Sequence, residues 1–485
     1  MIFNDLREFI AEVEKRNDVK VIEGADWNVE IGLITEWQMS EPNNPLLLFK
    51  NIKGYPADYS IATNLFGTPA RTALALGMDP ATRRLDIVRN LRDSFGAGFV
   101  PIPPVEVENP PVKENIHTGD EVDLYKIPVP KWHAKDGGRY IGTGCAVITR
   151  DPDDGSINLG TYRVQVHDKS IATIYMSPGR HGKNMRNKYW ERGQNCPAAV
   201  AIGMDPVLYM GSHSDVPKGM CEYDYTGGFR KKAVEITRGV ATGLPIPARA
   251  EIVLEGEMIE KQTVQEGPFG EWTGYYASGE REEAIFKVKA ISYRHRPILQ
   301  GNPPLRSPYF ALAHNLRRSA SAWVDLDKTI PGVKGVWLLD DAAFNMIVVV
   351  SVEQRYPGHA MQAAMGIAFS HATSYMNRFI ILVDEDIDPS NMQDVLWALA
   401  TRCEPETSID ILRGMRGTPL DPVLSPEKRQ RGDYTHSTAI LNACRPYAWK
   451  DEFPMTIMST PEELEGVKKK WGKLFAEGGK GISFG

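Results

Sequence analysis

The spacing of apolar residues near the start of the chain predicts a small unit of helices and strands. Residues 5–16 carry apolar side chains on one helical face, a stripe that must pack against another element. These apolar residues are Leu6, Phe9, Ile10 and Val13. Short apolar runs at residues 46–50 and 59–65 are typical of buried strands, and a helix over residues 69–76 follows the capping residue Thr68. We expect these elements to form an α/β unit.

The pattern changes after a proline-rich stretch, residues 100–111, that can enter neither a helix nor the interior of a sheet. Alternating and β-branched runs then predict a strand over residues 140–149 and a hairpin of residues 157–166 and 170–176, joined by residues 167–169. Further strands are predicted over residues 198–203, 248–259 and 284–293. This middle part of the chain is therefore β-rich.

The last third of the chain returns to alternating helices and strands. Helical periodicity is present at residues 311–326, 359–376, 390–401 and 461–476. Strand-like apolar runs occupy residues 333–339, 345–352, 379–384 and 408–412, and we expect the last two, with the helix between them, to form a βαβ unit. The final helix either docks on its own chain or reaches another subunit.

At 485 residues the chain exceeds what one hydrophobic core usually serves, so several domains are expected. We divide it into an N-terminal α/β unit, a central domain, a linker helix and a C-terminal α/β domain, spanning residues 1–110, 111–305, 306–330 and 331–485. The overall class is α/β, with the central domain giving it an α+β character.

Composition excludes several kinds of partner and compartment. The net charge is −6 and the basic residues are dispersed, so the chain lacks the basic patch typical of nucleic-acid-binding proteins. Five scattered cysteines without a CxxC pair argue against a disulfide framework and a zinc site, which fits a reducing cytoplasm. No signal-peptide pattern and no run of about 18 apolar residues is present, so we expect a soluble protein without a membrane span.

Two carboxylates stand five residues apart across a glycine-rich turn, in the hexapeptide Glu266-Gly-Pro-Phe-Gly-Glu271. Gly267 and Gly270 tolerate backbone angles that let both side chains point into one pocket. Paired carboxylates in unequal environments can divide their roles, one staying charged while the other delivers a proton. The alternative is a surface turn with two solvated acids, and the hexapeptide alone does not decide between them.

Three residues of metal-ligand type occur in the middle of the chain: Asn158, His181 and Glu222. An amide, an imidazole and a carboxylate suit a divalent ion such as manganese better than zinc. Each alone is also typical of a turn or of a surface position, and their spacing matches no local metal motif. Arg163 and Arg180 add cations that could pair with a phosphate or carboxylate, in a chain without a GxGxxG or Walker A loop.

Taken together, these motifs resemble the UbiD family of reversible decarboxylases over almost the whole chain. The shared stretches are Asn158-Leu-Gly-Thr-Tyr-Arg163, Gly179-Arg-His181, Glu222 with the following Thr-Gly-Gly-Phe-Arg230, the Glu266–Glu271 hexapeptide, and Leu382-Val-Asp-Glu-Asp-Ile-Asp388. The resemblance implies an N-terminal α/β unit, a central split β-barrel that binds prenylated FMN, and a C-terminal α/β domain used in oligomerisation.

The same resemblance implies roles for individual residues. It makes Arg163, Glu266 and Glu271 catalytic, and Asn158, His181 and Glu222 the ligands of a divalent metal, usually Mn²⁺, that bridges to the cofactor phosphate. A K⁺ site would use Glu222 again, with Leu159, Gly211, Ser212 and Ser214. Cofactor contacts would also come from Thr161, Tyr162, Arg163 and Arg180. The pocket wall would include Ser177, Arg180, Leu305 and Arg306, the last two in a loop unlike the commoner family version.

One departure concerns the late motif, where many relatives carry a lysine. This chain has Thr438 near that position, after His436 and before Asn442, so a lysine contact to the cofactor phosphate is in doubt.

The function implied is a non-oxidative, prenylated-FMN-dependent decarboxylase of an aromatic or heteroaromatic acid, with a covalent substrate–cofactor adduct and Glu271 as proton donor. Its partners would be the acid, CO₂, a flavin prenyltransferase that supplies the cofactor, and copies of itself in a dimer or hexamer. Three alternatives keep the fold: a decarboxylase of acrylic-type acids, plain flavin redox chemistry, and a non-catalytic or carboxylase-complex flavin subunit. The sequence decides neither the acid nor the physiological direction.

Overall fold

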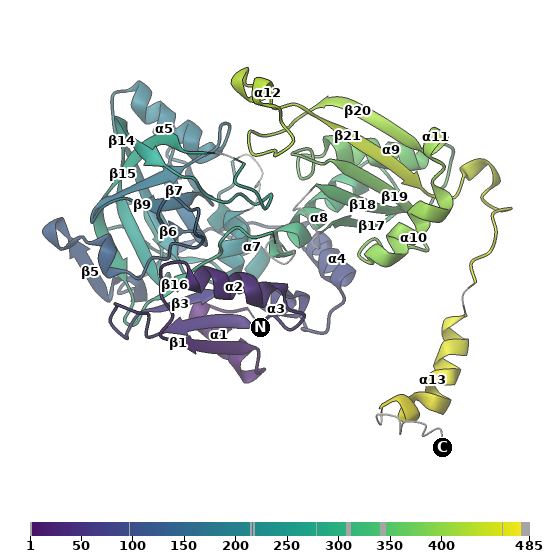
Figure 1. Ribbon diagram of the computed structural model, residues 1–485, viewed down its shortest axis with the longest axis horizontal. Helices are drawn as coiled ribbons and strands as arrows, with labels where there is room; N and C mark the ends of the chain where they lie inside the picture. The colour runs from purple at the N-terminus through teal and green to yellow at the C-terminus, as the bar shows by residue number, and fades with distance from the viewer. Residues whose placement is uncertain are drawn as a thin grey trace. The chain divides into compact units, whose positions relative to one another are not determined.

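The structure is a computed structural model (Figure 1) that describes residues 2–476, except 97, 214–215, 217–218, 278, 307–311, 340–345 and 458. The chain divides into two compact units, residues 1–444 and 445–485. The first unit holds the three sheet-containing regions that the sequence predicts.

The N-terminal region is a four-stranded sheet with helices packed on it. Its strands are β1 (Val19–Glu23), β2 (Leu46–Lys50), β3 (Ser60–Thr63) and β16 (Ile298–Gln300), in the order β1-β2-β3-β16. Its helices are α1 (Leu6–Lys15), α2 (Glu30–Ser40), α3 (Pro69–Ala75) and α4 (Arg84–Phe95). The apolar stripe of α1 is buried and Thr68 caps α3, as predicted, whereas β1, α2 and α4 were missed.

The proline-rich stretch is mostly extended, as expected, and residues 105–106 pair only at the edge of a small sheet. This sheet consists of β13 (Pro245–Pro247), β12 (Glu235–Arg238) and β4 (Val105–Glu106), in that order. An edge strand accommodates neighbouring prolines because only one of its sides needs hydrogen-bond donors.

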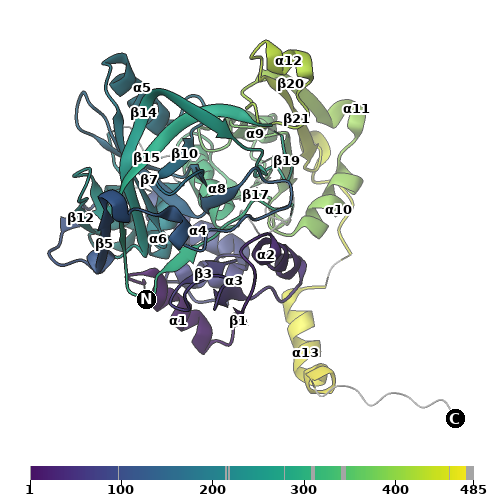
Figure 2. The same ribbon diagram turned by 60° about the vertical axis from the view of Figure 1, so that its left-hand side comes forward.

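The central region is a nine-stranded sheet that curls strongly, as Figures 1 and 2 show. Its main path has the order β6-β9-β10-β15-β14-β11-β7-β8, and β5 pairs with β15. The strands are β5 (Asn115–Thr118), β6 (Arg139–Gly142), β7 (Cys145–Arg150), β8 (Ile157–Gly160), β9 (Arg163–Val166), β10 (Ile171–Tyr175), β11 (Cys196–Ile202), β14 (Ile252–Glu266) and β15 (Arg281–Tyr293).

Two predicted strands of this sheet are each divided into two strands in the structure. The run 140–149 breaks between β6 and β7 because the chain changes partners, from β9 to β8 and β11. The run 157–166 breaks in the same way between β8 and β9. The predicted hairpin survives as β9 and β10, which pair antiparallel.

Short helices cover the central sheet and position its polar residues. These are α5 (His181–Glu191), α6 (Pro206–Ser212) and α7 (Glu222–Arg230), together with the 3₁₀ turns η1 (Pro111–Lys113), η2 (Gly119–Glu121) and η3 (Leu124–Lys126). Helix α5 packs on β7, β8 and β11, and α7 packs on α6 and β8. The strand β8 therefore contacts both α5 and α7.

The C-terminal region contains a five-stranded sheet in the order β17-β18-β19-β21-β20. Its strands are β17 (Val333–Leu338), β18 (Ile347–Val352), β19 (Phe379–Asp384), β20 (Ile409–Met415) and β21 (His436–Ala443). Its helices are α8 (Leu312–Asp327), α9 (His359–Phe369), α10 (Met392–Arg402), α11 (Pro405–Ser408) and α12 (Pro426–Gln430). The predicted pairing of β20 with β19 is wrong, because the missed strand β21 lies between them and pairs antiparallel with β20.

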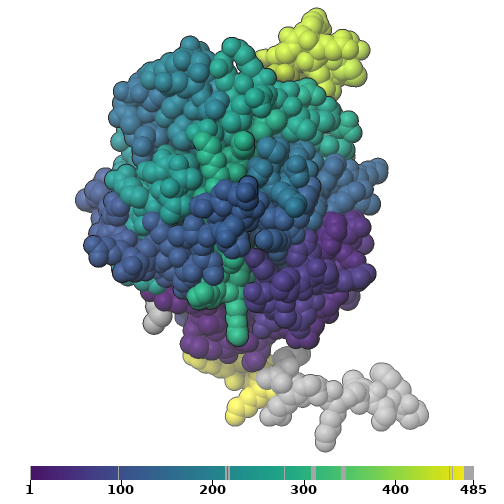
Figure 3. Space-filling model, turned by 90° about the vertical axis from the view of Figure 1, so that its left-hand side faces the viewer, coloured from purple at the N-terminus to yellow at the C-terminus, as the bar shows by residue number. Residues whose placement is uncertain are grey.

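Three apolar cores hold the first unit together. One fills the curled sheet and includes Trp132, Tyr140 and Phe286, together with residues of α2 and β2. Another joins α1, α4 and α8 to the C-terminal sheet, and a third lies under α6 and α7. On the face shown in Figure 3, the N-terminal region (purple) lies directly against the central region (blue and teal). Within the described residues, no helix is long and apolar enough to cross a membrane.

The second unit contains the predicted last helix, α13 (Pro461–Ala476), with the bounds that the sequence indicates, and the short turn η5 (Tyr447–Trp449). Thr460 and Glu463 form a reciprocal pair of backbone to side-chain hydrogen bonds at the start of α13.

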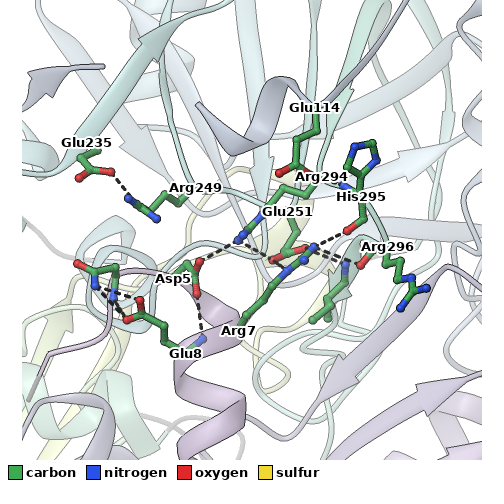
Figure 4. A network of polar contacts seen from close by, with 12 residues as sticks. Asp5, Arg7, Glu8, Glu114, Glu235, Arg249, Glu251, Arg294, His295 and Arg296 are labelled. Carbon is green, nitrogen blue, oxygen red and sulfur yellow. Dashed lines mark hydrogen bonds and ion pairs between the residues drawn. The ribbon is translucent and has the colours of Figure 1, made fainter. Parts of the chain in front are cut away.

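A buried ion-pair network ties α1 to the central sheet (Figure 4). Glu251 has a fully buried side chain and accepts two hydrogen bonds from Arg7, at 2.8 and 2.7 Å. Arg294 lies 3.2 Å from the same carboxylate and 2.9 Å from Asp5. Glu251 immediately precedes β14 and Arg294 immediately follows β15, so these contacts fix α1 to the open end of the β14–β15 hairpin.

Replacing Glu251 by alanine should cost about 3 kcal/mol of unfolding free energy, because it breaks the ion pair with Arg7 and removes one of the two carboxylates that face the buried Arg294. The matched control is Glu257→Ala in β14, where the carboxylate pairs with Lys289 at a partly exposed position. The control should lose no more than about 1 kcal/mol. Urea unfolding of both variants measures the difference, and equal losses would contradict this account of the network.

Candidate active site

The two carboxylates of the hexapeptide lie at the end of β14 and in the turn that follows it. Glu266 is the last residue of β14, and Gly267 adopts a φ of +87°, which favours glycine. The turn is closed by backbone hydrogen bonds from Glu271 to Tyr275 and from Gly274 to Glu271. Glu266 is 0% exposed and Glu271 6% exposed, so the alternative of two solvated acids is excluded.

Arg163, the first residue of β9, bridges both carboxylates. Its Nε and Nη2 donate to the two oxygens of Glu266, each at 2.8 Å, and its Nη1 donates to Glu271 at 2.6 Å. Burial lowers the pKa of Arg163, but the hydrogen bonds and charges of Glu271 and Glu266 have the larger effect and raise that pKa overall. Arg163 therefore stays a cation between two carboxyl groups.

Further donors surround Glu266, and the sequence did not single them out. The Tyr140 hydroxyl donates to Glu266 at 3.2 Å, and Arg281 Nε lies 3.8 Å from it. Burial and the charge of Glu266 raise the pKa of Tyr140, so its hydroxyl stays protonated. Gln165 accepts a hydrogen bond from the Gly267 backbone at 3.0 Å and fixes the start of the turn. Besides Arg163, Tyr140 thus donates a hydrogen bond to Glu266, and Arg281 adds a positive charge nearby.

Tyr175 was also missed, although the predicted hairpin contained the signal for it. The short turn after β9 sets a register in which Tyr175 lies opposite Arg163. Its ring lies under two guanidinium groups, with Cζ of Arg163 at 4.4 Å and Cζ of Arg281 at 4.1 Å from the centroid. Cation–π contacts of this kind hold both arginines in place.

The three predicted divalent-metal ligands come from β8 and from the two helices that contact it. Asn158 is in β8, and His181 and Glu222 begin α5 and α7, the two helices that contact β8. Asn158 is buried and its Nδ2 lacks a hydrogen-bond partner within the described part of the chain, whereas His181 is exposed. Glu222 is buried and accepts a hydrogen bond from the Leu159 backbone at 2.8 Å.

The chemistry of these residues supports the predicted metal and phosphate, which stay predictions. An amide, an imidazole and a carboxylate are suitable ligands, and the N-termini of α5 and α7 favour an anion nearby. Among the described residues no group of three or more His, Cys, Asp and Glu could hold a metal. The predicted set has only two residues of those types, so this absence does not bear on it.

The predicted K⁺ ligands Gly211 and Ser212 form the C-terminal end of α6, where carbonyl oxygens favour a cation. Ser212 Oγ lies 3.1 Å from Thr161 Oγ1, which joins α6 to the segment after β8. Leu159 is beside Asn158 in β8, and Ser214 lies outside the described residues.

Of the other predicted cofactor contacts, Tyr162 links β8 to α5. Its buried hydroxyl accepts a hydrogen bond from the Gly182 backbone at 3.3 Å, and a Cβ at Gly160 would meet its ring at 2.6 Å. Arg180 precedes α5, and its Cζ lies 5.9 Å from the ring centroid of Tyr375 in the C-terminal region. Arg180 thus faces the C-terminal region.

The predicted pocket-wall loop lies against the turn that carries Glu271. Pro304 approaches Gly270, and Arg306 packs beside Gly274, where an added Cβ would meet its Cα at 3.3 Å. Leu305 is buried and Arg306 exposed, while residues 307–309 lie outside the described part. Ser177 lies between β10 and α5, and its carbonyl accepts a hydrogen bond from the Arg180 backbone.

The late motif is β21 of the C-terminal sheet. Thr438 is fully buried there, and its hydroxyl donates to the Asn377 carbonyl at 2.7 Å. Both ring nitrogens of His436 lie within hydrogen-bond distance of backbone carbonyls, and Asn442 accepts from the Cys444 backbone. The Thr438 hydroxyl proton is therefore used inside the sheet.

Comparison with known proteins agrees with this architecture. Three models of 3-octaprenyl-4-hydroxybenzoate carboxy-lyase domains match consecutively: the N-terminal domain at residues 10–91, the Rift-related domain at 104–307 and the C-terminal domain at 314–443. Together with the curled sheet, they define a carboxy-lyase. The chain belongs to the UbiD family.

Solved structures of similar proteins match along nearly their whole length. Vanillic acid decarboxylase of Sedimentibacter hydroxybenzoicus, in open form, is 28% identical, with 98% of this chain and 100% of that chain covered and a TM-score of 0.85. The UbiD-class enzyme HmfF of Pelotomaculum thermopropionicum, in complex with FMN, is 26% identical (96% and 99% covered, TM-score 0.84). Apo 3,4-dihydroxybenzoic acid decarboxylase of Klebsiella pneumoniae is 27% identical (96% and 99% covered, TM-score 0.82).

Proposed function

We propose that the chain is a prenylated-FMN-dependent, non-oxidative and reversible decarboxylase of an aromatic or heteroaromatic acid. The observation that carries this proposal is Arg163, which bridges the buried Glu266 and Glu271 in a member of a carboxy-lyase family. Two of the similar enzymes act on hydroxylated benzoic acids by name, which supports an aromatic substrate here.

Binding of a flavin is supported by HmfF, which has been solved with FMN and, as an evolved dimeric form, with prFMN. In this chain Asn158, His181 and Glu222 would hold Mn²⁺ against the cofactor phosphate. Glu222, Leu159, Gly211, Ser212 and Ser214 would hold K⁺. Asn158 Nδ2, which lacks a hydrogen-bond partner within the described part of the chain, is a donor that could face a phosphate oxygen, and the metal ligand would be Oδ1. Bound prenylated FMN would supply the electron sink for the pair released with CO₂.

The protein residues would bind the substrate carboxylate, transfer the proton and exclude water. Arg163 has five N–H donors, and three of them are used on the two carboxylates, so the others can hold the substrate carboxylate. Glu266 would keep Arg163 charged and oriented. Glu271 would give its proton to the carbon that loses CO₂ and regain one afterwards. Burial of the network would exclude water from the proton transfer.

The test is direct. The protein is purified with its cofactor from a host that makes prenylated FMN, and the absorption spectrum and mass of the released cofactor are measured. CO₂ release from a panel of aromatic acids follows. Prenylated FMN together with CO₂ release would support the proposal. Unmodified FMN with redox turnover, or prenylated FMN without turnover of any acid, would favour a redox enzyme or a non-catalytic subunit.

We further propose that the substrate carries a second polar group or ring heteroatom. Arg306 and Arg180 flank the turn and helix of the site and favour such a group over a hydrocarbon tail. The value of kcat/KM should be higher for a hydroxylated or heteroaromatic acid than for cinnamic acid. Arg306→Ala should reduce that preference about tenfold, the low end for a lost polar contact. A preference for cinnamic acid, or an unchanged ratio in Arg306→Ala, would contradict this pocket.

Other features of the proposal concern organisation. The dimeric form of HmfF supports a homo-oligomer for this chain, either a dimer or a hexamer. A separate flavin prenyltransferase would supply the cofactor. Domain limits at residues 110, 305 and 330 stay predictions.

A further inference from the structure

A row of four side chains crosses four neighbouring strands at the site. The strands β9, β10, β15 and β14 are consecutive in the sheet, and Figure 2 shows β10, β15 and β14 running together. Each contributes one residue: Arg163, Tyr175, Arg281 and Glu266. Arg163 and Glu266 are joined directly by hydrogen bonds, and Tyr175 and Arg281 lie beside this pair.

Strand register puts all four on one face of the sheet. Tyr175 lies opposite Arg163, and Arg281 lies opposite Glu266. The pairing of β10 with β15, in which Thr173 faces Ile285, places Tyr175 and Arg281 on the same face by simple alternation. The position of Arg281 beside Glu266 is therefore built into the sheet.

Arg281 has unused hydrogen-bonding capacity. Its Nε is buried and has no hydrogen-bond partner within the described part of the chain, and it lies 3.8 Å from Glu266 Oε2. Stacking on Tyr175 holds the guanidinium in place, and the side chain is 24% exposed. A cation in this position acts on the fully buried Glu266 mainly through its charge.

The charges of the proposed reaction need such a cation. When Glu271 carries its proton and the substrate carboxylate is bound, two negative charges, on Glu266 and on the substrate, share the one positive charge of Arg163. Uncompensated negative charge in a buried site is costly. We propose that Arg281 is a positioning residue that keeps Glu266 ionised while Arg163 engages the substrate carboxylate, an inference that rests on the proposed function.

Two variants test whether the charge of Arg281 matters. Arg281→Gln removes the charge, and Arg281→Lys keeps it. Lys287→Gln is the matched control, since it removes an exposed positive charge from the same strand. Infrared difference spectra of the protein without substrate, recorded against pH, follow the carboxylic acid band that Glu266→Gln deletes. Other charged or titratable groups around Glu266 are Arg163, Tyr140, His167 and Glu271.

In Arg281→Gln, the band should appear at a pH about one unit higher than in the unaltered protein, the low end for loss of an opposite charge at this distance. The KM of the acid substrate should rise about tenfold, and Arg281→Lys should restore both values. An unshifted band in Arg281→Gln, or a lysine variant as altered as the glutamine variant, would overturn the inference. Because the infrared measurement needs no turnover, an unshifted band with normal decarboxylation by the unaltered enzyme would overturn this inference and leave the proposed function standing.

Discussion

Glu271→Gln should abolish most decarboxylation while leaving metal and cofactor bound. The substitution keeps the shape of the side chain and removes the proton that Glu271 is proposed to deliver. Its oxygen can still accept the Arg163 hydrogen bond of 2.6 Å, so the network geometry should persist. General acid catalysis contributes about a hundred- to ten-thousandfold in rate, and the loss of kcat should fall in that range.

The matched control is Glu282→Gln, which neutralises an exposed carboxylate on β15 outside the network. The control should retain normal kcat, cofactor content and metal content. Rapid-quench measurement of CO₂ release and the flavin absorbance of each purified variant separate a catalytic defect from a binding defect. Near-normal decarboxylation by Glu271→Gln would remove Glu271 from the role of proton donor.

Sequence patterns predicted elements whose signal is local. The strand β19 and the helix α13 have the bounds expected from their apolar runs, and α1 buries the expected stripe. A helical face or a fully buried strand is encoded in adjacent residues, so no knowledge of distant partners is needed. The hairpin of β9 and β10 belongs to the same class, because its short turn fixes the register.

Patterns failed where distant partners decide the structure. The apolar run 140–149 gives no sign that its two halves pair with different strands, β6 with β9 and β7 with β11. The strand β21 was overlooked because it enters the C-terminal sheet from far along the chain and separates β19 from β20. Sheet order is a property of non-local pairing, which single-sequence periodicity does not carry.

The candidate site likewise contains residues that the sequence predicted and residues that only the folded sheet reveals. The hexapeptide and the resemblance pointed to Arg163, Glu266 and Glu271, and the structure brings these three residues into contact. Tyr140 and Arg281 escaped attention because each is an ordinary residue of a strand until the sheet curls and pairs. Burial of the two carboxylates likewise depends on the loop at residues 301–306 and on the central core, which the hexapeptide cannot show.

Glu222→Ala and His181→Ala should each yield protein with little manganese and little flavin. Each variant removes one of three proposed protein ligands, and loss of even an outer partner typically lowers metal affinity about 10- to 100-fold. Glu222→Ala also removes the acceptor for the Leu159 backbone N–H, so its effect should be the larger. Metal analysis by mass spectrometry and flavin absorbance per chain measure both losses on the same samples.

Asp224→Asn is the control for this prediction, since Asp224 lies in the same first turn of α7 and its carboxylate accepts a hydrogen bond from the Cys221 backbone N–H. The Asp224→Asn variant should retain metal and flavin, because Glu222 is the proposed metal ligand and Asp224 is not. Added Mn²⁺ in large excess should restore flavin binding to His181→Ala more readily than to Glu222→Ala, because Glu222 is also a proposed K⁺ ligand and accepts the Leu159 backbone N–H. Equal manganese and flavin in Glu222→Ala and the unaltered protein would show that the metal, if bound, is held elsewhere.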